Sequence, residues 1–217
     1  MSNTRQNRND YIDCTSVEKE KWKKPIGRKK MTDNQRYIEN VLLNTKRPNI
    51  EKLLKYMSEN GFYEMPASGS GDKHLAEKGG LAQHSILVTD TMFKLKDSLN
   101  VDIKEDSIYI CGLLHDLGKI GQFGKAGYVE NILASGKQSE SKPYKCNKEL
   151  LKVPHEIRSV MEVYRCIELT EEEAHAILYH NGLYGDLKYQ ISGNETSLYL
   201  LLHFADMWSS RILERVE

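Results

Sequence analysis

The sequence predicts an all-α protein, a bundle of helices that carries one small irregular or β-hairpin flap. Apolar residues recur every three or four positions in several segments after residue 32, as helices that bury one face require. Residues typical of helix ends, mainly glycine, proline and a threonine followed by glutamates, flank these segments. One stretch, residues 121–148, instead mixes glycine, serine and lysine with short runs compatible with strands, and it predicts the flap.

Residues 1–31 precede this pattern and contain few apolar residues at any regular spacing. They carry a basic cluster made of Lys21, Lys23, Lys24, Arg28, Lys29 and Lys30. We expect a loosely ordered tail here, followed by a single domain over residues 32–217. Contact with phosphates is one role open to the tail, but a solvated extension is the simpler interpretation.

Two helices are expected between Asp33 and Asn60, with a break near Arg47-Pro48, because proline disfavours helical geometry at the residue before it. Asn60-Gly61 is a plausible stop for the second helix. The apolar residues at helical spacing are Ile38, Val41, Leu42, Ile50, Leu53, Leu54 and Met57.

The next two expected helices each carry a histidine. Gly79-Gly80 follows a loop and leads into a helix with His84 on or beside its apolar face. A further helix is expected over residues 106–120, with His115 and Asp116 in its last turns.

The C-terminal half predicts the flap and three more helices. Short strands are expected around residues 128–133 and 142–146. Helical patterns then cover residues 150–167, 170–180 and 196–216. A capping box, Thr-Glu-Glu-Glu, opens the second of these helices.

Bulk composition points to a soluble globular protein. Hydrophobic residues make up 39% of the chain, mean hydropathy is −0.59, and no apolar run approaches the roughly 20 residues that a membrane-spanning helix needs. The N-terminus shows no signal-peptide pattern, so we expect a cytoplasmic protein without a membrane partner. The four cysteines are widely separated and are expected to stay reduced. Basic and acidic residues balance at 31 each, which gives no overall attraction to nucleic acid.

Several histidines and aspartates are distributed over the expected helices. Imidazole and carboxylate groups bind divalent metals, and such groups can converge in the core of a bundle. Lys119 lies one turn beyond His115, where its ammonium could hold a phosphate oxygen. Any one of these histidines, taken alone, is more often a hydrogen-bonded core residue than a ligand. The candidates are His84, His115, Asp116, His155, His180 and Asp206.

Asp206 is the hardest candidate to explain without a metal. It stands in an apolar stretch, and a buried carboxylate costs several kcal/mol unless it is paired or metal-bound. Arg211 is its structural competitor, although five residues separate them. His203, one turn earlier, either orients Asp206 or serves as an ordinary core histidine.

The ordered set of motifs resembles the HD superfamily of metal-dependent phosphohydrolases. The match covers roughly residues 62–211 and is most similar to small bacterial and phage HD hydrolases and to the HD domain of a 3′→5′ exoribonuclease. It rests on Pro66-Ala67-Ser68, His74, Gly79-Gly80-Leu81-x-x-His84, His115-Asp116-Leu117-Gly118-Lys119, His155-Glu156-x-Arg158-Ser159, Tyr179-His180-Asn181-Gly182 and His203-x-Ala205-Asp206.

This resemblance implies a fold, a cofactor and a set of roles. The implied fold is the HD-domain helical bundle. The implied cofactor is one or two divalent transition-metal ions, and a His/Asp site accepts Mn, Fe, Co, Ni or Zn. Asp116 would bridge the ions, Lys119 would bind phosphate and His74 would lie near the substrate entrance. The first metal would be held by His84, His115, Asp116 and Asp206, and the second would be completed by His155 and His180.

The function expected from this reading is cleavage of phosphoester bonds in a nucleotide or a nucleic-acid end by metal-activated water. Tyr128 and Tyr144 of the flap, with neighbouring lysines, would place aromatic faces and cations beside the substrate. An ordinary solvated hairpin is the competing interpretation of the flap. Two other functions stay open: a deoxynucleoside triphosphohydrolase that releases triphosphate, and a metal-bound nucleotide sensor or binding module with little turnover.

Overall fold

The computed structural model describes residues 31–70 and 75–214, and the chain from Thr32 onward forms one compact unit. The described part confirms the all-α prediction, because its β-structure is limited to two small two-stranded sheets and one isolated bridge. The predicted basic tail lies outside the described residues, apart from Met31, and so does His74. The helices are α1 (Asp33–Asn44), α2 (Ile50–Glu59), α3 (Gly80–Leu99), α4 (Glu105–Leu114), α5 (His155–Tyr164), α6 (Glu171–Tyr179), α7 (Lys188–Ile191) and α8 (Ser197–Trp208).

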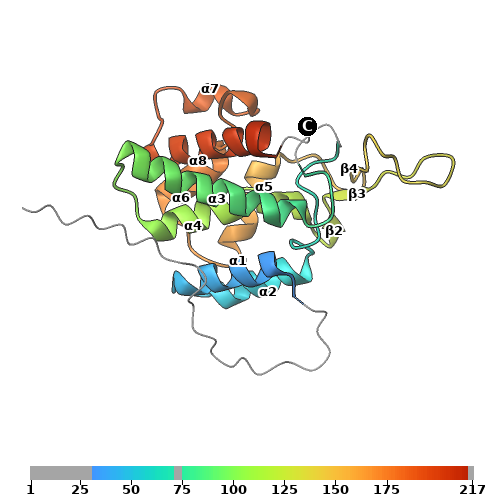
Figure 1. Ribbon diagram of the computed structural model, residues 1–217, viewed down its shortest axis with the longest axis horizontal. Coiled ribbons are helices and arrows are strands. Elements are labelled where there is room, and N and C mark those ends of the chain that lie inside the picture. Colours follow the sequence, from blue (N-terminus) through green and yellow to red (C-terminus); the bar gives the residue numbers. More distant parts are fainter. Residues whose placement is uncertain (1–30, 71–74, 215–217) are drawn as a thin grey trace, which may run out of the picture. The chain divides into compact units, whose positions relative to one another are not determined.

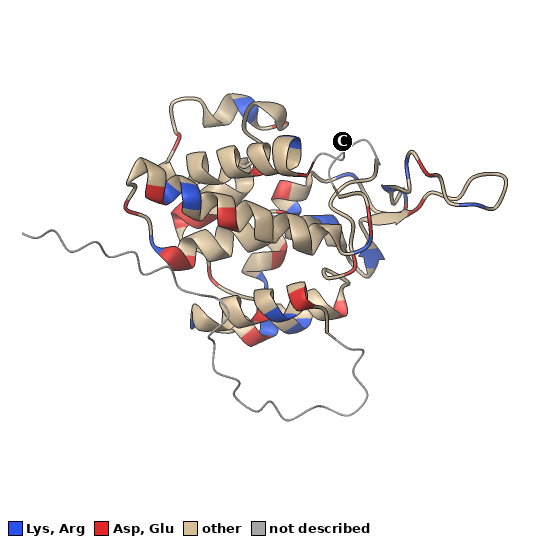
Figure 2. Ribbon diagram, in the orientation of Figure 1, with Lys and Arg blue, Asp and Glu red and all other residues tan. Residues whose placement is uncertain are grey.

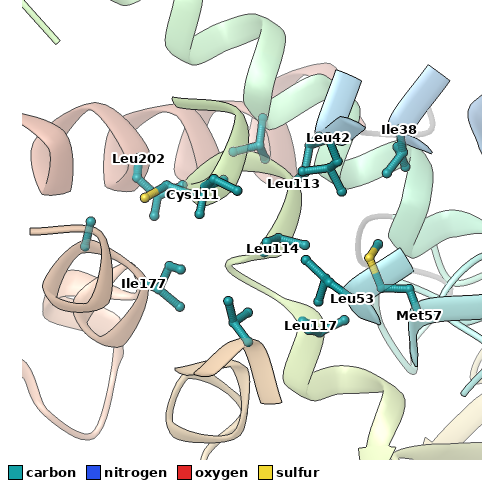
Figure 3. Close-up of a cluster of buried hydrophobic side chains, with 14 of the residues drawn as sticks. Ile38, Leu42, Leu53, Met57, Cys111, Leu113, Leu114, Leu117, Ile177 and Leu202 are labelled. Atoms are coloured by element: carbon teal, nitrogen blue, oxygen red, sulfur yellow. The ribbon is translucent and has the colours of Figure 1, made fainter. Parts of the chain in front are cut away.

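The helices pack around α3, which contacts α1, α4 and α8 (Figure 1). In turn α6 packs against α4, α5 and α8, while α2 contacts α1. Their apolar faces meet in one cluster (Figure 3). Burying each leucine or isoleucine in this cluster stabilises the fold by about 1.5–3 kcal/mol relative to exposure. Fully buried members include Ile38, Leu42, Leu53, Met57, Leu113, Leu114 and Leu117.

Local signals explain several helix ends. The predicted break near Arg47-Pro48 is confirmed, because α1 ends at Asn44 and α2 begins at Ile50. The predicted capping box at Thr170 is also confirmed. The Thr170 side chain accepts from the N–H of Glu173 at 3.2 Å, and the Glu173 carboxylate accepts from the N–H of Thr170 at 2.9 Å. These contacts satisfy two backbone donors at the start of α6.

The helix predicted over residues 150–167 is too long, since α5 begins only at His155. Pro154 precedes it, and a proline both lacks an N–H and pushes the residue before it out of helical geometry. Proline therefore fixes His155 as the first residue of its helix. The sequence prediction also missed two short elements, the 3-10 helix η2 (Gly182–Tyr184) and α7.

Two further α-helices end earlier than predicted, because the chain continues in a 3-10 helix in one case and in a π-helical turn in the other. The helix over residues 106–120 stops at Leu114, and the 3-10 helix η1 (Leu117–Ile120) follows, with the N–H of Lys119 donating to the carbonyl of Asp116. The helix over residues 196–216 stops at Trp208 and continues as a π-helical turn, η3 (Ser209–Leu213). Both changes occur beside the candidate ligands.

The flap is a pair of consecutive hairpins. Strands β1 (Gly121–Gln122) and β2 (Lys125–Ala126) form the first, and β3 (Tyr128–Glu130) pairs antiparallel with β4 (Tyr144–Cys146) in the second. The predicted hairpin is thus confirmed, although β3 ends three residues early. The N–H of Tyr144 donates to the carbonyl of Gly69 at 3.2 Å, which ties the flap to the loop before α3.

Charged residues of both signs intermingle on the helices and along the flap (Figure 2). This agrees with the balanced count of 31 basic and 31 acidic residues. Among the described residues, no helix is both long and apolar enough to cross a membrane.

A buried ion pair links the start of the bundle to α6 and gives a stability prediction. Arg47 donates to the Glu173 carboxylate at 3.0 Å, and Ser107 of α4 donates to it at 2.7 Å. Burial alone would raise the pKa of Glu173, but hydrogen bonds from Arg47, Ser107 and the Thr170 N–H outweigh it and hold the pKa below its usual value. The ionised carboxylate therefore stabilises the fold above its unfolded pKa of about 4.3, and this contribution disappears as pH falls through the lower folded pKa.

Replacing Glu173 with glutamine is expected to cost about 2 kcal/mol of unfolding free energy at pH 7. Glutamine preserves the capping box, so the change tests the charge. The loss should shrink when thermal unfolding is measured below pH 4. The matched control is Glu172→Gln at an exposed position of the same helix. An equal loss at pH 7 and pH 3 would contradict the assignment.

Candidate metal centre

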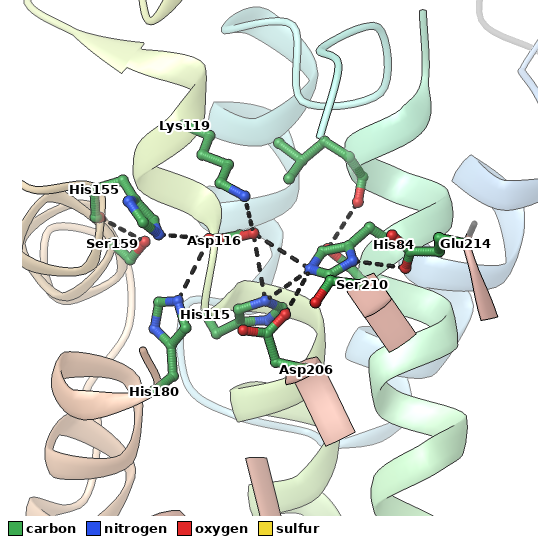
Figure 4. Close-up of polar contacts among 12 residues, drawn as sticks. His84, His115, Asp116, Lys119, His155, Ser159, His180, Asp206, Ser210 and Glu214 are labelled. Atoms are coloured by element: carbon green, nitrogen blue, oxygen red, sulfur yellow. Dashed lines mark hydrogen bonds and ion pairs between the residues drawn. The ribbon is translucent and has the colours of Figure 1, made fainter. Parts of the chain in front are cut away.

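The structure brings the six predicted ligands together from five elements (Figure 4). Four of the side chains are almost completely buried, with exposures of 0% or 1%. His84 lies in the second turn of α3, the pair His115-Asp116 lies between α4 and η1, and His155 begins α5. The remaining two are His180, directly after α6, and Asp206, in α8.

The turn after α4 orients the side chains of His115 and Asp116. His115 is the last residue with helical backbone angles, and Asp116 leaves them, with φ −102° and ψ 11°. The 3-10 turn that follows places Lys119 on the same side as Asp116, and Lys119 Nζ lies 2.6 Å from Asp116 Oδ2. The regular helix predicted here would have placed Lys119 over His115 instead. The change of turn type therefore moves the cation onto the carboxylate.

Gly118 allows α5 to approach this turn. Its N–H donates to Ser159 Oγ at 2.8 Å. A Cβ at this position would lie 2.1 Å from the carbonyl oxygen of His155, so only glycine fits without a shift of the backbone. The close approach sets His155 Nε2 3.1 Å from Asp116 Oδ1. The sequence marked Gly118 as part of the His-Asp-Leu-Gly-Lys motif, but it did not indicate this close approach.

The two oxygens of Asp116 face different histidines. Oδ2 lies 3.4 Å from the Nε2 atoms of both His84 and His115. Oδ1 instead lies 3.1 Å from His155 Nε2 and 3.6 Å from His180 Nε2. Asp116 therefore lies between two groups of histidines, one at each carboxylate oxygen.

Asp206 belongs to the first of these two groups. Its Oδ1 lies 3.2 Å from His84 Nε2, which in turn lies 3.2 Å from His115 Nε2. Arg211, the competing partner considered from the sequence, instead lies over the ring of Tyr184, 4.5 Å from its centre. His203 donates from Nδ1 to the carbonyl of His180 at 2.8 Å, so the described contact connects it to His180 and not to Asp206.

The histidines present Nε2 to the centre because Nδ1 is held from outside. His115 Nδ1 lies 3.0 Å from the carbonyl of Gly112, and His180 Nδ1 lies 2.8 Å from the carbonyl of Ile177. A carbonyl only accepts, so each Nδ1 carries the hydrogen and each Nε2 keeps its lone pair. Outer partners of this kind orient histidine ligands in metal sites.

Sequence reasoning missed Glu214. Its Oε1 lies 2.8 Å from His84 Nδ1, so it is the outer partner of that histidine. No local pattern marked this residue, because a glutamate near the end of a helix is ordinarily solvated.

Electrostatics keep the carboxylates ionised. Burial alone would raise the pKa of Asp116, but Lys119 and His115 outweigh it and hold the pKa well below its usual value. Burial would also raise the pKa of Asp206, but the hydrogen bond with His84 outweighs it and lowers the Asp206 pKa. Burial would lower the pKa of Lys119, but the charge of Asp116 raises it above its ordinary value. Asp116 and Asp206 are therefore anions, and Lys119 is a fixed cation beside Asp116.

These residues fit a divalent ion. Two sets of three, His84 with His115 and Asp206, and His115 with Asp116 and His180, offer ligand atoms that all lie within 4.8 Å of one another. Asp116 Oδ1 is buried and faces the Nε2 atoms of His155 and His180, so a carboxylate oxygen and two imidazoles point toward one place. Imidazole and carboxylate donors suit Mn, Fe, Co, Ni and Zn.

A cavity of about 400 Å³ opens onto the centre. Lys119, Tyr128 and Tyr144, three of the four residues predicted to bind substrate, all line it. The fourth, His74, lies outside the described residues. Other residues lining the cavity are Ser68, Lys142, Lys145, Asn181, Tyr184 and Arg211.

Comparison with known proteins gives one match. A family model described as HD domain matches residues 81–199, more than half of the 217-residue chain. This range contains five of the six candidate ligands, and Asp206 lies just beyond it. Neither a curated protein nor a solved structure matches the chain, so the closer likeness to phage hydrolases or an exoribonuclease stays a prediction.

Proposed function

Because this chain belongs to the HD domain family, whose members are in general metal-dependent phosphohydrolases, we propose that it cleaves phosphoester bonds of a nucleotide or a nucleic-acid end. The observation that carries the proposal is the position of Asp116. Its two oxygens face two groups of histidines, and Lys119 lies beside it at the base of the cavity.

The first metal would be held by one set of side chains and the second by another, with Asp116 shared. Divalent ions at such a site lower the pKa of a water toward neutrality and balance the charge of phosphoryl oxygens. Lys119 would hold an equatorial phosphoryl oxygen and stabilise the negative charge that develops there. His84, His115, Asp116 and Asp206 would form the first set, and Asp116, His155 and His180 the second.

The walls of the cavity support a nucleotide as the substrate. Tyr128 and Tyr144 from the flap and Tyr184 from η2 supply aromatic faces, on which a base can stack. Lys142 and Lys145 add cations that attract phosphates. A volume of about 400 Å³ lies within the range of small-molecule sites. The balanced overall charge does not favour tight binding of long duplex DNA.

Replacing Lys119 with methionine is expected to lower kcat by about 100-fold, because one contact to the transition-state charge is lost. Methionine replaces the aliphatic stem of lysine with an unbranched chain of similar shape and removes the cation. The measurement is steady-state kinetics at saturating metal. The matched control, Lys145→Met at the exposed rim of the cavity, should affect KM more than kcat. An unchanged kcat in Lys119→Met would refute the assigned role.

The deciding experiment is a panel of nucleotides, dinucleotides and short oligonucleotides assayed with Mn²⁺, Co²⁺ and Ni²⁺. Release of inorganic phosphate or of a nucleoside monophosphate would support the proposal. Anion-exchange analysis that finds inorganic triphosphate would replace it with a deoxynucleoside triphosphohydrolase. Saturable nucleotide binding without hydrolysis under every metal would replace it with a sensor or binding module.

A further inference from the structure

The end of α8 contains a local exception to hydrophobic patterning. Leu213 is 47% exposed, whereas the side chain of the next residue, Glu214, is 0% exposed. The second carboxylate oxygen of Glu214, Oε2, has no hydrogen-bond partner among the described residues. Burying a carboxylate while exposing a leucine is unfavourable, and conflicts of this kind are typical of functional sites.

The π-helical turn η3 is the reason that Glu214 is buried and Leu213 is exposed. In a continued α-helix, the residue seven positions after Asp206 shares its face, and that residue is Leu213. Here the N–H of Glu214 donates to the carbonyl of Ser209, five positions earlier, at 3.0 Å. One extra residue therefore fits into the turn, and Glu214 takes the inward position. Ser209 is fully buried, and its Oγ lies 3.4 Å from Thr91 Oγ1 of α3.

The inward carboxylate meets His84 in the second turn of α3 (Figure 4). Glu214 Oε1 lies 2.8 Å from His84 Nδ1, while His84 Nε2 lies 3.2 Å from Asp206 Oδ1. An ionised carboxylate only accepts, so Nδ1 carries a hydrogen. Nε2 is then the nitrogen that would offer its lone pair to an ion bound at the centre.

The position of His84 explains why it needs a distant partner. His115 and His180 follow the ends of their helices, and their outer partners are the carbonyls of Gly112 and Ile177. These carbonyls belong to the last four residues of α4 and α6, where helices leave carbonyls unpaired. His84 lies inside α3, where the helix itself uses the carbonyls. A side chain from another element must therefore supply the acceptor.

We propose that Glu214 is a positioning residue of the metal centre, which holds His84 in the one tautomer and ring orientation that direct Nε2 to the ion. This inference rests on the proposed function only in that both require a bound metal. Glu214 lies outside residues 81–199, the range matched by the HD domain model.

The test uses Zn²⁺ alone as the probe and two variants of the full chain. Glu214→Gln keeps the size of the side chain and removes its charge, and Glu214→Leu removes every hydrogen bond. Zn²⁺ affinity, measured by competition with a chelator, is expected to fall by about 10-fold in the first and by up to about 100-fold in the second. The exposed neighbour Leu213 supplies the matched control, Leu213→Ala, which should bind Zn²⁺ as the wild type does.

Two further measurements separate positioning from a merely structural role. Nitrogen-15 NMR of the His84 ring in the Zn²⁺-loaded protein should show hydrogen on Nδ1 in the wild type, and this signal should weaken or shift in Glu214→Leu. The thermal midpoint of metal-free Glu214→Gln should not fall, because glutamine can still accept from His84 Nδ1 while the buried charge, with its unpartnered Oε2, is removed.

Three results would overturn the inference. They are an unchanged Zn²⁺ affinity in both variants, an unchanged His84 Nδ1 signal in Glu214→Leu, and an affinity loss that only accompanies a lower thermal midpoint of the metal-free Glu214→Gln protein. No substrate enters these measurements, so a failure of the proposed phosphohydrolase function in the nucleotide panel would leave their outcome unaffected.

Discussion

Replacing Asp116 with asparagine is expected to lower phosphoester hydrolysis by about 1000-fold, which corresponds to about 4 kcal/mol of transition-state stabilisation. The carboxylate faces His84 and His115 with one oxygen and His155 with the other. Asparagine preserves the volume but replaces one oxygen with an amide NH₂ group, which cannot bind a metal. The change therefore leaves this side chain able to serve at most one of the two proposed metal positions. The measurement is kcat/KM on the best substrate of the panel, together with the bound metal content.

The control for this variant is Asp97→Asn at an exposed position of α3. It should keep wild-type kinetics and metal content. Circular dichroism should show that Asp116→Asn retains the helical fold. Activity of Asp116→Asn above a tenth of the wild-type value, with the fold intact, would exclude Asp116 as a shared ligand.

Removal of divalent metal by chelation and dialysis is expected to abolish hydrolysis and to lower the thermal midpoint. The candidate ligands come from five separate elements, so an ion that binds them favours the folded state only. An ion at 100 times its dissociation constant adds about 2.7 kcal/mol of stability, which corresponds to roughly 5–10 °C for a domain of this size. Adding back Mn²⁺, Co²⁺ or Ni²⁺ should restore both properties.

The same treatment of Asp116→Asn tests whether the stabilisation arises at this centre. Metal should raise its thermal midpoint much less than that of the wild type. Full activity of the wild-type protein after exhaustive chelation would refute the proposed chemistry.

Much of the fold could be predicted because each long helix buries one apolar stripe and carries a local end signal. Thr170 marked the start of α6, and Arg47-Pro48 marked the break between α1 and α2. Pro154 contained the signal that shortens α5, but the apolar pattern around it concealed that signal. The π-helical turn at Ser209 had no local signal, because it depends on how the end of α8 packs against α3.

The six candidate ligands could be selected from spacing and resemblance, whereas their mutual geometry could not. The division of the Asp116 oxygens depends on the 3-10 turn after α4 and on the approach of α5 to Gly118. Glu214 could not be found from the sequence for the same reason. Its role arises from one extra residue in a turn, and the pattern of a regular helix points to Leu213 instead.

The contact at Gly118 has a consequence for how such a protein can diversify. It joins η1 directly to α5. The flap lies between these two elements in the sequence, and the contact that holds them together does not involve flap residues. None of the six candidate ligands lies in the flap. Doubling the length of such a loop costs only about 0.6 kcal/mol. Insertions and substitutions in residues 121–148 could therefore accumulate over generations and alter which molecules enter the cavity, while the candidate metal centre is inherited unchanged.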